Sequence, residues 1–179
     1  RFNPTLGITK SPWVGLTYFK QFFQSYYFKD VLVNTLSLSV FTMLVGFPVP
    51  IFLALLINEI KSTKLKKAVQ NITYMPNFLS IVVIVSMLSL FSNKEYGLFN
   101  QITAFFGAKP VDFMSRPSAF QPLYVFSNVW QNMGFNAIIY IAALSAIDPQ
   151  LYEAASIDGA TRMQKIIHIS IPCIMGTIL

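Results

Sequence analysis

Side chains that commonly carry out catalysis or bind metals are scarce in this sequence. The one cysteine, Cys173, and the one histidine, His168, cannot supply the usual four ligands of a structural zinc site or form an internal disulfide bond. No carboxylate pair, Ser-His set or phosphate-binding G-x-x-x-x-G-K-[ST] pattern lies at a plausible position. An enzyme active site is therefore not predicted. We expect His168 to lie at a helix end near lipid headgroups and Cys173 to be a small buried group.

Polar and aromatic side chains gather instead inside two long apolar segments. Residues 127–136 interrupt one of them, and residues 70–77 occupy the first half of the other. Polar groups at mid-membrane depth are costly unless they face other helices or a water-filled cavity. They therefore either line a pathway for a polar solute or join helices to one another. The candidates are Trp130, Gln131, Asn132, Asn136, Tyr140, Tyr74 and Asn77.

The elements that must position these residues are predicted by the absence of charge. Residues 31–58, 68–93 and 117–147 contain no Asp, Glu, Lys or Arg. The hydrocarbon core of a bilayer is roughly 30 Å thick and is crossed by about 20 helical residues. Charged residues make up 11% of the chain, against about 25% in soluble domains. We therefore predict an all-α membrane protein with transmembrane helices at 31–57, 68–92 and 118–147.

Two details of these helices follow from proline. Pro48 and Pro50 lie inside the first predicted span, where each removes a hydrogen bond and should kink the helix. The third stretch is longer than a bilayer requires, so its helix is expected to begin near Gln121 or Pro122.

Lysine residues predict the orientation of the chain. The loop at residues 58–67 contains Lys61, Lys64, Lys66 and Lys67, and the positive-inside rule places such a loop in the cytoplasm. Residues 1–30 are then an external or interfacial segment, in which residues 17–30 form a surface helix or pack on other helices. Residues 93–117 become an external loop. We attribute the net charge of +6 to contacts with lipid headgroups and not to nucleic acid.

The segment at residues 148–170 returns to the cytoplasmic side and contains several helix boundary signals. Asp148 followed by proline predicts a helix start, and Asp158-Gly159 predicts its end. Thr161 with Gln164 fits a capping box that starts a second helix, which is expected to end at Pro172. Two short helices at an angle, too polar to cross a membrane, are suited to contact a cytosolic partner. Residues 171–179 then begin a further span.

This two-helix loop resembles the EAA loop of permeases from binding-protein-dependent ABC importers, whose pattern is E-A-A-x3-G-x9-I-x-L-P. The spacing is kept in full, and only the leucine is replaced, by Ile171. The string from Asp148 to Ala160 is similar to the carbohydrate branch of the family. Weaker similarity to polysaccharide-type and maltose-type sugar permeases is found at residues 11–16, 34–36, 54–59 and 74–78.

The resemblance implies a MetI-like helical bundle and a transport subunit that is not itself an enzyme. This fragment would hold helices two to four of six, the loop and the start of helix five. Its partners would be a cytoplasmic ATPase dimer that binds ATP and magnesium, a related second permease and an extracytoplasmic solute-binding protein in a bacterial cell membrane. No cofactor is expected in this chain. The residues implied in coupling to the ATPase are Glu153, Ala154, Ala155, Asp158, Gly159, Ile169 and Pro172.

Other functions remain open on the sequence alone. The amide and aromatic candidates could contact a sugar, since sugars offer hydroxyl groups to amides and C–H faces to rings. A permease for peptides, metals or another solute could share the same loop. A membrane scaffold that recruits a cytosolic partner is the alternative from a different class, although it has no need of polar residues at mid-membrane depth. Arg162 and Lys165 are expected to be solvated or to face lipid.

Overall fold

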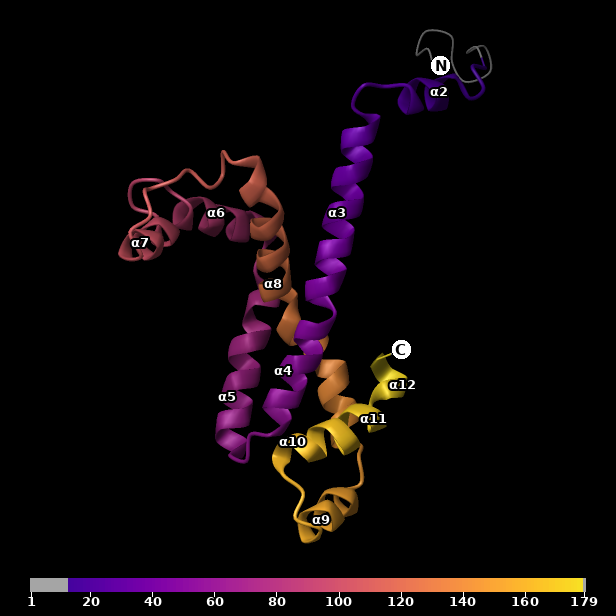
Figure 1. The fold of residues 1–179 in the computed structure, drawn as a ribbon, viewed down its shortest axis with the longest axis vertical. Coiled ribbons are helices and arrows are strands. Elements are labelled where there is room, and N and C mark those ends of the chain that lie inside the picture. Colours follow the sequence, from indigo (N-terminus) through magenta and orange to yellow (C-terminus); the bar gives the residue numbers. More distant parts are fainter. Residues whose placement is uncertain (1–12, 179) are drawn as a thin grey trace. The chain divides into compact units, whose positions relative to one another are not determined.

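The structure is a computed structural model that describes residues 13–178. The first part of the predicted external segment, residues 1–12, and the last residue of the predicted final span therefore lie outside the described residues. The chain divides into two compact units, residues 1–40 and 41–179, which are described separately. All regular structure in the described part is helical, which confirms the predicted all-α class (Figure 1).

The first unit contains α2 (Thr17–Phe23) and the first part of α3 (Phe28–Gly46). The rings of Phe22, Phe23 and Phe28 meet edge to face at centroid distances of 5.1 to 5.8 Å and hold the corner between the two helices. No residue of either helix is buried.

The first predicted span is interrupted near its middle. α3 ends at Gly46 and α4 (Pro48–Asn58) starts after Phe47, as the two prolines predicted. The Phe47 N–H still bonds to the Met43 carbonyl at 3.0 Å, so the interruption is mild. Taken together, Phe28–Asn58 is 31 residues long with a mean hydropathy of 2.5 in its most apolar window, and it is long and apolar enough to cross a membrane.

The second predicted span is not one uninterrupted helix. α5 (Thr63–Tyr74) runs into the 3-10 helix η1 (Met75–Phe78), and α6 (Ile81–Phe91) leaves at a bend of 99°. Pro76 removes a backbone donor inside η1, and the Ser80 side chain starts α6 by accepting from the Val82 N–H at 3.3 Å. By length and composition this pair passes as a broken span or a re-entrant loop.

α7 (Leu98–Phe105) lies in the loop between α6 and α8. The Asn100 side chain, 4% exposed, organises this loop. Its amide donates to the carbonyls of Asn93 at 2.9 Å and Val111 at 2.8 Å, and its oxygen accepts from the Val111 N–H at 2.8 Å. The loop is therefore closed by one buried side chain.

α8 (Pro117–Ser145) is 29 residues long and begins earlier than the sequence predicted. The expected start near Gln121 or Pro122 is wrong, because Pro122 in the second turn removes only one backbone hydrogen bond and the helix accommodates it. α8 is not among the candidate membrane spans found in the described residues. It is long and uncharged, so the polar residues in its middle explain its lower hydropathy.

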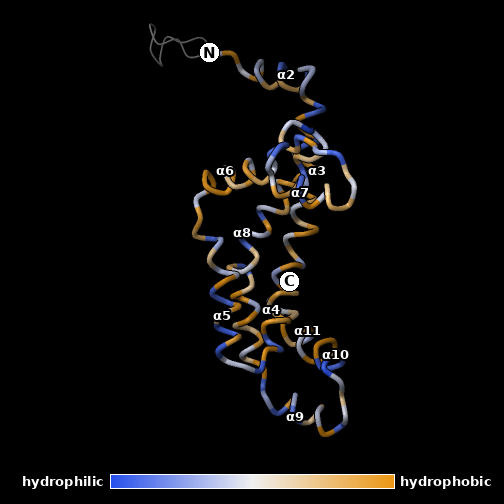
Figure 2. Tube along the Cα trace, turned by 90° about the vertical axis from the view of Figure 1, so that its left-hand side faces the viewer, coloured by the Kyte–Doolittle hydropathy of each residue, from blue (hydrophilic) through white to orange (hydrophobic). Residues whose placement is uncertain are grey.

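The core of the second unit lies where α4 packs on α8, with α5 alongside both (Figure 1). Many other large apolar side chains of this unit are exposed, among them Phe52 of α4 and Val82 of α6. Figure 2 shows α6 as almost wholly hydrophobic, whereas α5 alternates. Such surfaces require lipid or further helices as neighbours. The buried core residues are Ala54, Leu55, Ile57, Ala137, Ile141, Leu144 and Ile174.

The C-terminal part contains α9 (Pro149–Ile157), α10 (Arg162–Lys165), the π-helix η2 (Ile166–Ser170), α11 (Ile171–Cys173) and α12 (Met175–Ile178). Within this unit, both views place α9 at the end of the bundle where the lysine-rich loop joins α4 to α5 (Figures 1 and 2). α5, η1, α6, α7 and α8 lie between these two loops in the chain.

Two predictions for this part are wrong. Pro172 does not end the second helix of the loop, because the wide π-helical turn before it lets the helix continue to Cys173. Cys173 is exposed. The following residue, Ile174, is 1% exposed and occupies the place in the core instead.

Candidate functional site

The sharp bend between α5 and α6 is closed by amide side chains from α8. Asn77 in η1 donates from Nδ2 to Oδ1 of Asn132 at 3.0 Å. Gln131 donates from Nε2 to the carbonyl oxygen of Leu79, just after η1, at 3.0 Å. A broken helix leaves carbonyl groups without their usual partners, and at membrane depth these groups need other donors. Through Gln131, α8 therefore supplies a donor to one backbone carbonyl at the bend, and through Asn132 it accepts from the Asn77 side chain.

These contacts involve three of the seven candidate pathway residues predicted from the sequence. Asn132 also donates from Nδ2 to the Asn128 carbonyl at 2.8 Å, so both ends of its amide are occupied. Asn77, Gln131 and Asn132 thus join helices to one another in this structure. A solute that bound to them would have to displace those hydrogen bonds.

Gly134 allows α8 to approach this broken segment closely, and the sequence analysis did not single it out. It is buried, and a Cβ at this position would collide with the carbonyl group of Thr73 and lie 3.0 Å from the backbone nitrogen of Tyr74. Small residues at helix contacts allow such backbone approach in membranes. A glycine next to several amide residues in an apolar segment could have indicated such a close helix contact.

Asn136 and Tyr140 lie in a different place. Together with residues beside the break between α3 and α4 they line a hollow of about 420 Å³. Neither side chain forms a hydrogen bond within the described part of the chain, so both can offer polar groups to a solute. The other lining residues are Gly46, Phe47, Pro50, Phe135 and Ile139.

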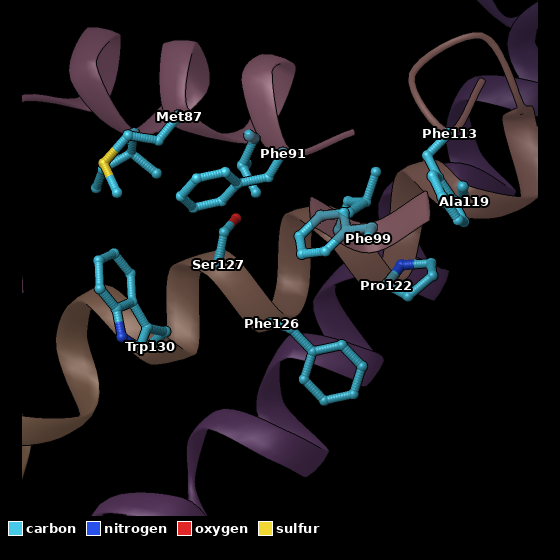
Figure 3. A pocket seen from close by; sticks show the side chains of 12 residues that line it. Met87, Phe91, Phe99, Phe113, Ala119, Pro122, Phe126, Ser127 and Trp130 are labelled. Carbon is cyan, nitrogen blue, oxygen red and sulfur yellow. The ribbon is translucent and has the colours of Figure 1, made fainter. Parts of the chain in front are cut away.

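Trp130 belongs to a third place, an apolar pocket of about 570 Å³ between α6, α7 and α8 (Figure 3). Phe91, Phe99 and Phe126 contribute rings to its wall. The Ser127 hydroxyl also lines it but already donates to the Tyr124 carbonyl at 3.0 Å. This pocket offers few polar partners to a sugar, and the structure does not bring Trp130 together with Asn136 and Tyr140 in one hollow.

The loop at residues 148–170 has the helix boundaries that the sequence predicted. The Asp148 side chain caps α9 by accepting from the Gln150 N–H at 2.9 Å. Gly159 has a φ of 77°. The Ala160 N–H bonds to the Ala155 carbonyl at 2.9 Å and the Gly159 N–H to that of Ser156 at 3.2 Å, the two bonds of a Schellman motif.

The second helix of the loop is also started as predicted. Thr161 and Gln164 form both hydrogen bonds of a capping box. His168 lies one turn further on, where its Nδ1 is 3.0 Å from the Gln164 carbonyl oxygen.

Side-chain bonds tie the two helices of the loop together. The Tyr152 hydroxyl of α9 lies 2.9 Å from the hydroxyl of Ser170 in η2, and Ser170 is 1% exposed. Lys165 of α10 donates from Nζ to the Ser156 hydroxyl of α9 at 2.6 Å. Lys165 is thus half-buried and bonded, not simply solvated as expected. Neither cross-link was predicted, because each depends on how the two helices meet, and together they join α9 to α10 and η2.

The outer surface of the loop is left free. Glu153 and Ala154 are exposed, and Glu153 forms no ion pair within the described residues. Ile157 is 87% exposed, an unusual position for a large apolar side chain. A hollow of about 350 Å³ separates α9 from the next helix, and Ala155, Asp158, Gly159 and Ile169 are among the residues that line it. Ile169 is half-buried and Pro172 is exposed.

An all-α bundle with a broken apolar segment and a two-helix loop at one end has the architecture that the sequence predicted for a membrane permease. Comparison with known proteins agrees. Residues 46–179 match the model of a family described as "Binding-protein-dependent transport system inner membrane component", and the chain belongs to this family. Proteins of this family are permease subunits and not catalysts.

Several similar proteins of known name are sugar transport permeases. The chain is 42% identical to the polygalacturonan/rhamnogalacturonan transport system permease protein YteP of Bacillus subtilis (strain 168), over 99% of this chain and 56% of that protein. It is 37% identical to the protein LplB of the same organism, again over 99% and 56%. The chain spans little more than half the length of these relatives.

A crystal structure of a bacterial ABC transporter involved in import of the acidic polysaccharide alginate contains a similar chain. The TM-score is 0.89 and the sequence identity 45%, over 94% of this chain and 59% of that one. The MetI-like permease fold predicted from the sequence is therefore confirmed.

Proposed function

We propose that this chain is part of the translocation subunit of an ATP-driven importer for oligosaccharides. The observation that supports this most is the loop at residues 148–170, in which Glu153 and Ala154 are exposed and Glu153 forms no ion pair within the described chain. The resemblance to sugar permeases supports the cargo class. One relative named above is a permease of a polygalacturonan/rhamnogalacturonan transport system, and the similar solved chain belongs to an importer of the acidic polysaccharide alginate. We extend the class of acidic polysaccharide fragments to this chain.

The coupling step follows from the rigidity of the loop. A cytoplasmic ATPase dimer binds ATP and magnesium, and it contacts α9 through Glu153, Ala154 and the exposed apolar side chains. Because Tyr152 and Lys165 tie α9 to the second helix, movement of α9 is passed on toward Ile174 and the core. Helix bundles then rock about a central site, which gives alternating access. This chain contributes no cofactor and no hydrolytic group.

The complete transporter has three further partners in this proposal. A second, related permease faces this one across the pathway, and an extracytoplasmic solute-binding protein delivers the sugar. The assembly spans a bacterial cytoplasmic membrane several times, with the loops at residues 58–67 and 148–170 inside.

Asn136 and Tyr140 are the preferred contacts for the sugar. They are the candidates that share a hollow and make no hydrogen bond of their own within the described chain. An amide can bind sugar hydroxyls and a ring can cover a C–H face. Tyr74 and Trp130 remain candidates on other surfaces, while Asn77, Gln131 and Asn132 are engaged in closing the bend.

The test is ATP hydrolysis by the complete transporter with its solute-binding protein, reconstituted in vesicles. Oligosaccharides from acidic polysaccharides are expected to stimulate hydrolysis and to be taken up. Stimulation by peptides or metal ions with no response to any glycan would reject the cargo class. ATPase recruitment without uptake of any solute would favour the scaffold alternative.

Replacing Asn136 by leucine is expected to weaken this stimulation, because the amide that meets the sugar is lost while the helix is kept. The apparent affinity of stimulation for the oligosaccharide is the quantity to measure. Asn128→Leu on the same helix lies outside the hollow and serves as the matched control. Equal effects of the two changes would show that the hollow is not the contact site.

Tyr152→Phe tests the cross-link inside the loop. Without the phenol, the Ser170 hydroxyl stays buried and loses its partner, which costs about 1–3 kcal/mol. We expect hydrolysis to continue while sugar taken up per ATP falls. Ser170→Ala should lower it too, and the double variant should add little to either single change. Tyr124→Phe, whose hydroxyl makes no bond in the described chain, should behave as wild type. Fully additive losses would show that the pair does not act together.

A further inference from the structure

The short helix α2 separates its residues into two faces. At 100° per residue, its aromatic side chains fall within an arc of about 140°, and its polar residues fall on the other side. The helix contains no acidic residue in its first turn, and Lys20 stands on the polar face. The aromatic face consists of Tyr18, Phe19, Phe22 and Phe23, and the polar face of Thr17, Lys20, Gln21 and the adjoining Gln24.

Apart from the Phe28 ring, which contacts Phe22 and Phe23, nothing in the described part of the chain covers the aromatic face. Phe19 is 63% exposed, Phe23 61% and Tyr18 51%, and no residue of α2 is buried. Trp13, Tyr26 and Tyr27, which flank the helix, are more than half exposed as well. This much exposed ring surface on a seven-residue helix calls for a neighbour of matching chemistry.

The depth of α2 is set by the span that follows it. Phe28 begins the apolar segment Phe28–Asn58. The connection from α2 is held by hydrogen bonds from the Ser25 N–H to the Phe22 carbonyl and from the Phe28 N–H to the Ser25 carbonyl, each 3.1 Å. The ring contacts of Phe28 with Phe22 and Phe23 close the same corner. Within this unit α2 runs crosswise to the first turns of α3 (Figure 1).

We infer that α2 is an interfacial anchor whose aromatic face is covered by the lipid headgroup layer. A helix joined by a stiff corner to the first residue of a span cannot leave the membrane surface. At that depth, rings with polar tips find both apolar and wet neighbours, and Lys20 and Lys29 meet lipid phosphates. The lipid contact of α3 thus continues along α2. This inference is independent of the cargo and of the coupling loop.

Nitroxide labels on the complete transporter test the inference. Cysteines are placed one at a time at residues 17–24 in a background where Cys173 and every other native cysteine of the transporter is replaced by serine. The transporter is reconstituted in vesicles of phosphatidylethanolamine with phosphatidylglycerol. Collision with oxygen, which concentrates in lipid, is compared with collision with a water-soluble nickel complex.

Lipid cover predicts a helical period in these measurements. Oxygen collisions should be several-fold more frequent at positions 18, 19, 22 and 23, and nickel collisions at positions 17, 20, 21 and 24. Low values of both at the aromatic positions would show packing against another subunit. Aromatic positions that are open to nickel until the solute-binding protein is added would show protein docking. Either of these results overturns the inference.

A pair of variants provides a second readout. Phe19→Glu with Phe23→Glu is expected to move a label at position 22 into water and to raise its nickel collisions toward the value at position 20. Gln21→Glu adds a charge on the polar face and should leave that label in lipid. An unchanged label at position 22 in the double variant would contradict lipid contact.

Discussion

Replacing Gly134 by alanine is expected to destabilise the transporter strongly. The added Cβ would collide with the Thr73 carbonyl of α5, which is backbone and cannot rotate away. Separation of α8 from α5 would also stretch the hydrogen bond between Gln131 and the Leu79 carbonyl. Overpacking costs about 1–3 kcal/mol or more, and each kcal/mol lowers the midpoint of thermal unfolding by about 2–4 °C for a chain of this size.

The measurement is the thermal loss of monodisperse transporter in detergent, with sugar uptake in vesicles as a second readout. Gly46→Ala is the matched control, because its Cβ would lie 3.7 Å from Val129 in ordinary contact. A wild-type midpoint for Gly134→Ala would mean that the two helices are not in close contact in the assembled transporter.

Replacing Gly159 by valine is expected to uncouple hydrolysis from transport while the protein is still inserted. Gly159 adopts a φ of 77°, and no atom lies within 4 Å of an added Cβ, so the cost is conformational. A left-handed residue other than glycine costs roughly 1–2 kcal/mol, and more for a β-branched one. An energy of that size is a factor of about 5–30 in the population of the correct loop. Sugar taken up per ATP should fall accordingly.

Gly159→Asn tests whether residue 159 is needed for its left-handed backbone conformation or for a contact with the ATPase. Asparagine tolerates the left-handed region, so this variant should retain much of the coupling that the valine variant loses. If both variants lose coupling equally, the position is a contact with the ATPase and not a conformational requirement. Normal uptake by the valine variant would reject the lever role of the loop.

The two-helix loop could be predicted in detail because its signals are local. Asp148, Gly159 and the pair Thr161 and Gln164 each determine a helix boundary within a few residues of themselves. The continuation of the helix through Pro172 could not be predicted, because a π-helical turn leaves no clear mark on a single sequence. The bond between Tyr152 and Ser170 depends on how two helices meet, which residue spacing does not reveal.

The membrane part shows the same division between local and distant information. Uncharged stretches located the apolar segments, and their polar residues marked where something other than lipid had to be close. The sequence could not say that Gln131 meets the Leu79 carbonyl while Asn136 meets open space. Such a distinction needs the register of α8 against its neighbours, and several registers would satisfy the same pattern of polar and apolar residues.

The bend between α5 and α6 has a consequence for the order of assembly during synthesis. Thr73 and Leu79 leave the ribosome before Gln131 and Gly134, which supply its closing contacts. Until α8 has been synthesised, the Leu79 carbonyl lacks the Gln131 donor of the finished protein. The segment from α5 to α6 therefore waits beside the insertion machinery with its bend not yet stabilised. The nascent chain thus acquires its mature shape here only after about fifty more residues have been translated, a delay inherent in long-range folding.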